Sequence, residues 1–410
     1  MFKLQRIPLQ IELLLAELQI FFNDYQWLHF RALLLSLLLT PYKATINGMV
    51  KVLSCGSHRS KHNEFINDCN QKLTKVLRYY AMLILSYLKK TGEPIYFIID
   101  DTTNKRRGKH IVAAFKFFDH ISKQYIWGHQ LVCAIIEYRG IVIPFGIDIY
   151  VPKGEQKAAD VPFRKKTEIA LDLLKVFEPE EGQEVFVLAD TFYAAPSILN
   201  LCRQRKYSFV SMLKTNRIFY IDGRQMNVDT YLKRVFKRNK RNRTIRLKQN
   251  KYEVHSNKAV LKSGGAVKLV CTRNTSHRTA KVIFTTNAAL PIESILTAYQ
   301  QRWSIEVFFK MSKQYLGLRA NQNRNLAAND SAVKLSLIAH NLLTHVFLEE
   351  IRAQGKRLTE KNLASFSVLT VRDHIRHVSQ VDSIEYCLEL NSNKSKNKVI
   401  AEIKKMLLAA

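Results

Sequence analysis

The stretch that decides the fold is Ile95-Tyr96-Phe97-Ile98-Ile99-Asp100-Asp101, which follows the turn-forming sequence Thr-Gly-Glu-Pro at 91–94. A short continuous apolar run bounded by turn residues is typical of a strand that is buried on both faces of a sheet. The apolar run stops at Asp100, so we expect a carboxylate at the end of a central strand.

The segments that follow alternate between strand-like and helix-like patterns. We predict strands at 125–138, 141–151, 185–189, 209–213 and 282–285, and helices at 163–177, 196–205, 292–316 and 331–349. This order predicts an α/β fold and resembles a ribonuclease-H-like catalytic core. The glycine-rich loops of dinucleotide-binding and P-loop folds are absent from the sequence, which disfavours both classes.

The remaining segments divide the chain further. Residues 1–90 have helical apolar spacing and are predicted to form a helical N-terminal region. The core is expected in two parts, 91–215 and 281–350, with a β-rich basic insertion at 216–280 between them and a helical C-terminal region at 351–410. Residues 233–251 hold ten Lys or Arg and no acid, which indicates either a solvated face or a surface that follows phosphates.

The charge of the chain indicates its class of partner. The 410 residues include 64 Lys plus Arg and 34 Asp plus Glu, a formal net charge of +30. Clustered Lys and Arg attract phosphates and release counterions when nucleic acid binds, so nucleic acid is the leading partner. A ribosome-associated protein, a merely soluble basic protein and a protein of anionic membrane surfaces are the alternatives.

Other features favour a cytosolic protein. The apolar segment 32–39 is too short to cross a membrane, and the N-terminus lacks the pattern of a signal peptide. The six Cys include no Cys-x-x-Cys pair, which favours reduced thiols. Cys55, His58, His62 and Cys69 lie close in sequence but match no zinc-finger spacing, so we do not predict a zinc site there.

Three acids are candidates for catalysis. Asp100 and Asp190 each follow an apolar strand-like run, and Glu306 lies in the predicted helix 292–316. Two strand-end carboxylates and a helix carboxylate can hold two Mg²⁺ ions, because hard divalent cations prefer oxygen ligands. A single Asp after an apolar run is more often a turn former, so the surroundings of Glu306 decide between the two interpretations.

Those surroundings form a spaced pattern, Tyr299-x2-Arg302-x3-Glu306-x6-Lys313. At roughly 100° per residue, steps of three, four and seven place all four side chains within about 60° on one helix face. Such a face suits metal-bridged phosphates: Glu306 holds a metal ion, Arg302 and Lys313 neutralise phosphates, and Tyr299 donates a hydrogen bond. The alternative is an amphipathic surface helix with an Arg/Glu pair of small energetic weight.

This pattern resembles the signature of DDE transposases of the insertion-sequence type-four superfamily. Ile99-Asp100-Asp101-Thr102 is similar to the first-Asp block of that family, and Val187-Leu188-Ala189-Asp190-Thr191-Phe192-Tyr193 to the second. The resemblance covers roughly residues 91–350. Two departures are visible: Asp101 is an alternative to Asp100 as the first ligand, and Thr191 stands where the family often has a small residue.

The resemblance implies an enzyme of cut-and-paste transposition, which cleaves DNA strands at inverted terminal repeats and transfers them into target DNA. It implies Asp100, Asp190 and Glu306 as catalytic metal ligands for two Mg²⁺ ions, which Mn²⁺ can replace, and Tyr299, Arg302 and Lys313 as DNA-phosphate-binding residues. The implied partner is double-stranded DNA, at the element ends and at the target, with residues 1–90 as a DNA-binding region.

The resemblance also implies a homodimer in the synaptic complex, no nucleotide cofactor, no membrane, and a cytoplasmic, nucleoid-associated location in a bacterial-type cell. Two other functions stay open. One is a catalytically inactive relative that acts as a sequence-specific DNA-binding protein, which the intact acid triad disfavours. The other is a ribonuclease-H-like structure-selective nuclease, which would share the metal site but would not need paired, sequence-matched ends.

Overall fold

The structure is a computed structural model. It describes residues 7–40, 43–52, 57–90, 92–108, 110–119, 122–238, 242–247, 249–276, 279–390 and 400. Cys55 of the group considered for zinc, four positions of the basic stretch 233–251, and the end of the C-terminal region lie outside these ranges.

In the described part of the chain, twelve strands form one mixed sheet of order β2-β3-β1-β5-β6-β12-β11-β10-β7-β8, with β4 beside β3 and β9 beside β10. The edge strand β2 spans Phe115–Asp119. Its core comprises β4 (Ile141–Tyr150), β3 (Gln124–Tyr138), β1 (Ile95–Lys105), β5 (Val185–Ala189) and β6 (Ser208–Met212). Strand β3 is antiparallel to β1 and β4, whereas β1, β5 and β6 are parallel. The predicted ribonuclease-H-like α/β core is therefore confirmed.

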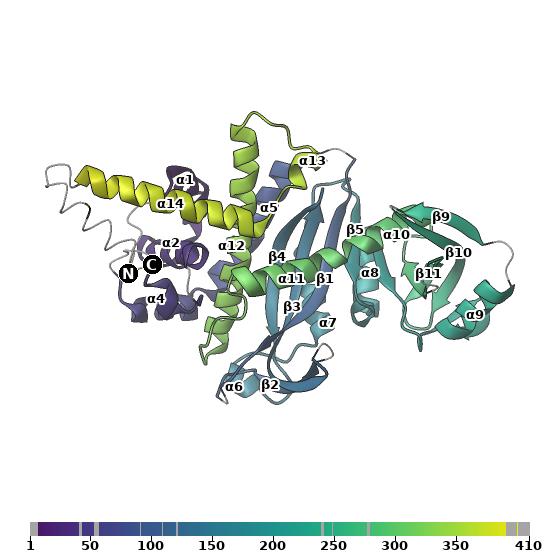
Figure 1. Ribbon diagram of the computed structural model, residues 1–410. Helices are drawn as coiled ribbons and strands as arrows, with labels where there is room; N and C mark the ends of the chain where they lie inside the picture. The colour runs from purple at the N-terminus through teal and green to yellow at the C-terminus, as the bar shows by residue number, and fades with distance from the viewer. Residues whose placement is uncertain are drawn as a thin grey trace.

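Helices cover the apolar centre of this sheet. Helices α7 (Lys166–Lys175) and α8 (Pro196–Gln204) pack against β3, β4 and β6. Helices α10 (Ile292–Gln301) and α11 (Trp303–Tyr315) run along β5, β6 and β1 (Figure 1). Phe97, Ile98 and Ile99 are consequently fully buried, as the apolar run of β1 requires.

A helical region packs against the β4 edge of the core (Figure 1). It contains α1 (Leu9–Ala16), η1 (Gln19–Phe21), α2 (Asp24–Leu39), α3 (Ile46–Met49), α4 (Arg59–Asp68), α5 (Asn70–Leu88), α12 (Leu326–Ala353), α13 (Glu360–Leu363) and α14 (Val368–Leu390). Helix α12 is long and apolar enough to cross a membrane, but 94% of its most apolar window is buried inside the protein. That burial is typical of the central helix of a folded core.

The segment between the two parts of the core extends the sheet beyond β6. It contains β7 (Ile218–Ile221), β8 (Arg224–Asn227), α9 (Val228–Arg238), β9 (Arg243–Leu247), β10 (Asn250–Leu261) and β11 (Gly265–Asn274), and β12 (Ala280–Thr285) joins it to β6. Figure 1 shows it at the opposite end of the molecule from α1, α2 and α14. Helix α9 was not expected in this β-rich segment.

Two predicted boundaries near the acids are wrong. Strand β1 does not end at Asp100 but continues to Lys105, because Asp101–Lys105 pair with Val132–Gly128 of β3. The helix predicted at 292–316 is divided into α10 and α11 at Arg302. Around Arg302 the backbone hydrogen bonds span three residues, from the Arg302 amide to the Tyr299 carbonyl and from the Ile305 amide to the Arg302 carbonyl.

Candidate active site

Sheet register brings the two aspartates together. The parallel pairing of β1 with β5 ends at Ile99 opposite Ala189, so Asp100 and Asp190 are the next residues on two neighbouring strands. Asp190 directly follows β5 and precedes the short helix η2 (Thr191–Tyr193). Because the last paired residues match, Asp100 and Asp190 extend from the same point of the sheet and toward the same face.

Helix α11 adds its carboxylate to this place through Arg302. The Arg302 guanidinium donates from Nη1 to Asp100 Oδ2 at 3.1 Å and from Nη2 to Glu306 Oε1 at 2.6 Å. One arginine thus joins the middle of β1 to the first turn of α11, across 202 positions of sequence. The three acids predicted from the sequence, Asp100, Asp190 and Glu306, therefore lie around one arginine and one sheet position.

The electrostatics of Asp100 indicate a site that lacks positive charge. Burial is the main reason that the pKa of the Asp100 carboxyl is raised to about 6; the Asp101 amide and Arg302 oppose this shift, and the charges of Asp101 and Asp190 add to it. At Arg302 burial lowers the pKa, but the hydrogen bond to Glu306 and the charge of Asp100 outweigh burial and raise it. Arg302 stays charged and neutralises only part of the acidic group.

The donor set fits a divalent cation in its chemistry. Carboxylate oxygens are the ligands that hard cations prefer, and a buried carboxyl with a raised pKa is stabilised in its ionised form by an added cation. Among the described residues, however, no three acidic, His or Cys side chains are grouped closely enough to hold a metal ion. Arg302 lies where it neutralises two of the three acids, so a metal ion would compete with its guanidinium.

The structure separates the roles of Asp100 and Asp101. Successive strand residues point to opposite faces, and Asp101 accepts from Lys166 Nζ of α7 at 2.6 Å, on the face away from α11. Sequence reasoning missed Lys166, because no spacing links α7 to β1. It also gave no role to Tyr193, which is fully buried and whose pKa burial and the neighbouring Asp101 raise. The geometry favours Asp100 over Asp101 as the carboxylate that faces Glu306.

The signature residues Tyr299 and Lys313 lie at two different sites. Tyr299 is partly buried against the core one turn before Arg302, and burial raises the pKa of its hydroxyl, although Arg302 opposes the shift. Lys313 lies about two helical turns beyond Glu306. Burial, followed by the charge of Arg319, lowers the pKa of the Lys313 amine. Tyr299 belongs to the acidic site, whereas Lys313 lines a separate basic cavity.

Polar residues of the β1 extension hold α11 in position. Asn104 donates to the Leu318 carbonyl at 2.6 Å, and Arg106 donates from Nη1 to the Asn321 carbonyl. Arg106 also donates from Nε to Nδ1 of His129 on β3 at 3.2 Å. These bonds attach the loop after α11 to the sheet. The only sequence signal for them is polar residues that continue after a buried apolar run.

Comparison with known proteins identifies the family. The family described as DDE superfamily endonuclease matches residues 18–279, which is well over half of the chain. The chain belongs to this family of DDE superfamily endonucleases. The match includes Asp100 and Asp190 and ends before Glu306, so the helix carboxylate of this endonuclease is placed by the structure alone.

Other comparisons add little. No protein of curated function matches the endonuclease. The NurA nuclease from Sulfolobus solfataricus is similar to it at 10% identity and a TM-score of 0.26, over 60% of this chain and 86% of that one. A likeness at that level carries no argument about fold or activity.

Proposed function

We propose that this endonuclease is an insertion-sequence transposase that cleaves DNA strands at inverted terminal repeats and transfers them into target DNA, with Mg²⁺ as its cofactor. The observation that carries the proposal is the Arg302 bridge between Asp100 and Glu306 beside Asp190. The bridge holds Asp100, the first acid of the sequence pattern, beside Glu306 and Arg302 of the Tyr-Arg-Glu-Lys signature.

When bound, Mg²⁺ supplies Lewis-acid stabilisation and a more acidic water at neutral pH. Asp100, Asp190 and Glu306 would hold it. Side chains of the protein would bind and orient the DNA backbone. Arg302, once released from the carboxylates, has a planar donor array that suits two oxygens of one phosphate, and Tyr299 offers a neighbouring hydroxyl donor. Arg302 lies one turn before Glu306 and Tyr299 one turn before Arg302, so they would orient the backbone beside the acids.

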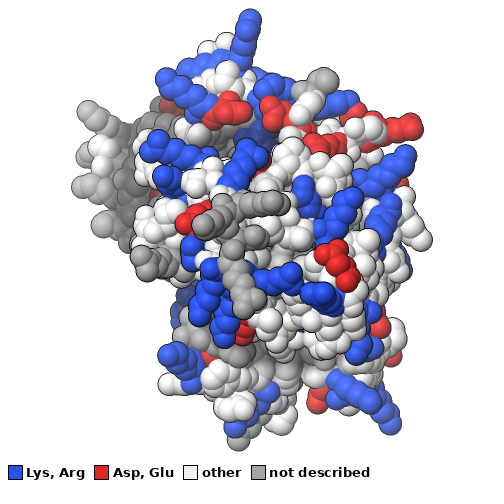
Figure 2. All heavy atoms as spheres, turned by 90° about the vertical axis from the view of Figure 1, so that its right-hand side faces the viewer, with Lys and Arg blue, Asp and Glu red and all other residues white. Residues whose placement is uncertain are grey.

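The surface charge supports DNA as the substrate. Lys233, Arg234 and Lys237 are exposed on α9, and Arg243 and Lys251 are exposed on the neighbouring strands. Figure 2 shows the end of the molecule that carries this insertion, with Lys and Arg spread over its face and Asp and Glu in the minority. A surface of this kind follows phosphates without reading sequence. We propose that it contacts duplex DNA next to the acidic site.

The partners and location follow from the same proposal. Cutting two ends of one element requires two active sites, so the active form would be a homodimer on DNA. The work would take place in the cytoplasm at the nucleoid of a bacterial-type cell. Two rivals remain: an inactive relative that binds specific DNA, and a structure-selective nuclease with the same acids.

An excision assay tests the proposal. The substrate is the gene's own locus with its flanks, incubated with purified protein and Mg²⁺, and the variant is Asp190→Ala. A matched control is Asp172→Asn, a half-exposed acid of α7 that pairs with Arg164. We expect wild type and Asp172→Asn to release a discrete linear element, and Asp190→Ala to release none. Binding of the flanks without cleavage by wild type would favour the inactive relative, and cleavage that follows DNA structure instead of element ends would favour the nuclease.

A further inference from the structure

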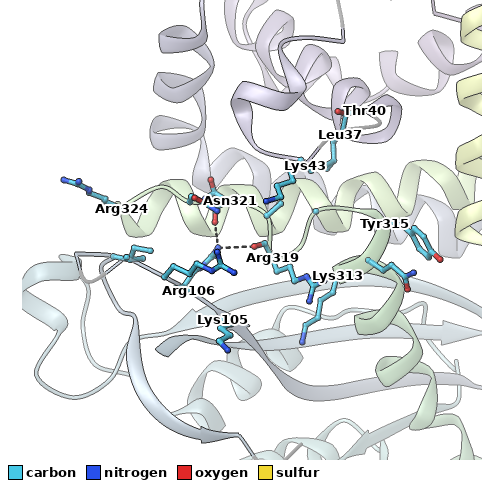
Figure 3. A pocket seen from close by; sticks show the side chains of 18 of the residues that line it. Leu37, Thr40, Lys43, Lys105, Arg106, Lys313, Tyr315, Arg319, Asn321 and Arg324 are labelled. Carbon is cyan, nitrogen blue, oxygen red and sulfur yellow. Dashed lines mark hydrogen bonds between the residues drawn. The ribbon is translucent and has the colours of Figure 1, made fainter. Parts of the chain in front are cut away.

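A basic cavity of about 880 Å³ lies beyond the acidic site. Four parts of the chain line it: the segment after α2 with Lys43, the end of β1 with Lys105 and Arg106, the end of α11 and its following loop with Lys313 and Arg319, and helix α14. Figure 3 shows Lys105, Arg106, Lys313 and Arg319 around one space between the strands and the loop. The cavity therefore lies between the helical region and the core.

The charge of the cavity is unbalanced. Nine Lys or Arg side chains line it, and none of its described lining residues is Asp or Glu. Arg106 is only 5% exposed, and its Nη2 has no hydrogen-bond partner among the residues that the structure describes. Like charges at this density repel one another, and a buried guanidinium nitrogen without an acceptor costs free energy. A ligand with several negative charges would neutralise the cations and give the Arg106 nitrogen an acceptor.

The size of the cavity limits that ligand. A cube of 880 Å³ has an edge of roughly 10 Å, which is less than the roughly 12 Å width of the major groove of B-DNA alone. The cavity is therefore narrower than a duplex, and its width suits a single strand. The volume is also within the range of roughly 300–1,000 Å³ that holds a small organic ligand, so a few nucleotides fill it.

An aromatic surface continues the same face of the sheet. In the register of β1 with β3, Asp100 lies opposite Cys133 and Asn104 opposite His129. Residues two apart on a strand share a face. Trp127 and Tyr125 of β3 therefore follow on the face that carries Asp100.

On that face Trp127 lies opposite Lys116 of β2 (Phe115–Asp119), and Tyr125 lies opposite Phe118. Tyr125 is 66% exposed, Phe118 41% and Trp127 38%. The Lys116 ammonium lies 5.3 Å from the centre of the Tyr125 ring. We call these four residues the hairpin surface.

The hairpin surface adjoins the cavity directly. The Trp127 indole donates a hydrogen bond of 3.0 Å to the carbonyl of Gly108, which lines the cavity. Trp127 lies six residues from Cys133, so it is about 20 Å from the strand position of Asp100. Proteins that bind single strands combine a cationic groove with exposed aromatic rings on which unpaired bases stack. A cationic cavity and exposed aromatic rings are both present here, on the face of the sheet that carries Asp100.

We propose that one strand of nucleic acid, separated from its complement, runs from the acidic site through the basic cavity and onto the hairpin surface. Its phosphates lie among the cations of the cavity, and its bases stack on Tyr125 and Trp127. The inference deepens the proposed function, on which it rests, because it names an unpaired strand beside the cleaved bond as part of the substrate. The cost of separating the strands would be offset by stacking on the rings.

Binding without metal ion tests the strand path separately from cleavage. The probes are a fluorescent oligothymidylate of about 15 nucleotides, near the upper end of known site sizes, and a duplex of the same length. The variants are Arg319→Glu, in the cavity, and Tyr125→Ala, on the hairpin surface; both side chains are exposed, so neither change disturbs the core. The matched control is Arg357→Glu, also exposed, beyond the far end of α12. Arg357 does not line the cavity.

We expect Tyr125→Ala to weaken oligothymidylate binding about tenfold. Arg319→Glu should also weaken it, and the slope of the logarithm of the binding constant against the logarithm of salt concentration (the salt slope) should fall in magnitude by at least about 0.7. Duplex binding and the Arg357→Glu control should change by less than about twofold. Unchanged oligothymidylate binding in both variants would overturn the strand path, as would an equal loss for the duplex. A protein that binds the strand in this way but never cleaves DNA with Mg²⁺ would contradict the proposed function and leave the strand path standing.

Discussion

The bridge made by Arg302 predicts a competition between the arginine and a divalent cation. In Arg302→Gln the charge that neutralises Asp100 and Glu306 is lost. We expect the variant to be less stable than wild type without metal ion and to bind Mg²⁺ more tightly. A cation that enters the wild-type site must displace the guanidinium, whereas the variant has nothing to displace.

The magnitude follows from the burial of the three side chains. Breaking a fully buried pair costs roughly 3–5 kcal/mol and an exposed one less than about 1 kcal/mol. Arg302 and Asp100 are 20% and 17% exposed, and Glu306 is 35% exposed and more screened. An intermediate value of about 2 kcal/mol corresponds to a roughly 30-fold tighter Mg²⁺ affinity in the variant.

The assay is thermal unfolding over a Mg²⁺ titration, since a ligand that binds only the folded state stabilises it by RT ln(1 + L/Kd), where L is the concentration of free ligand. Arg164→Gln is a matched control, because Arg164 also joins two carboxylates, Asp148 at 3.2 Å and Asp172 at 3.3 Å, away from the acidic site. It should lose stability without a change in Mg²⁺ affinity. Equal or weaker Mg²⁺ affinity in Arg302→Gln would refute the competition.

Three more predictions concern the sheet, a buried acid and the basic cavity. Gly128→Ala should destabilise the β1–β3 pairing, because a Cβ there would clash with the backbone carbonyl oxygen of Asn104; a melting temperature within a degree or two of wild type would contradict this. Burial raises the pKa of Glu137 to about 7, so its stabilising contribution is complete below about pH 4.5 and lost as the pH rises through 7. From about pH 5 to 8, denaturant unfolding should show wild type losing about 2.5 kcal/mol more than Glu137→Gln; parallel curves would contradict it. Lys313→Ala should weaken DNA binding and lower the salt slope by about 0.9 per lost phosphate contact; an unchanged slope would exclude a phosphate contact.

The sequence predicted the buried centre of the core well, because local pattern and tertiary packing agree there. The run before Asp190 is a strand with the expected bounds, Val185–Ala189. The prediction from sequence failed where pairing with a distant strand determines the secondary structure. Polar residues 101–105 do not look like a strand, yet pairing with β3 makes them one.

The same limit applies to the acidic site. Residue types and spacing at Tyr299–Lys313 predicted the face of a helix, and the structure places Arg302 and Glu306 beside Asp100. Spacing could not show that Arg302 pairs with both acids, nor that Lys313 lies in another cavity. Both depend on how α11 lies against β1, which the loop anchored by Asn104 sets.

We propose that DNA cleavage depends on the acids around Arg302. The most direct test of this proposal measures strand cleavage of the element ends by Glu306→Gln with Mg²⁺, alongside wild type and the surface control Asp172→Asn. We expect Glu306→Gln to bind the ends nearly as well as wild type and to cleave none of them, while the control cleaves normally. Mg²⁺-dependent cleavage at wild-type rate by Glu306→Gln would contradict it.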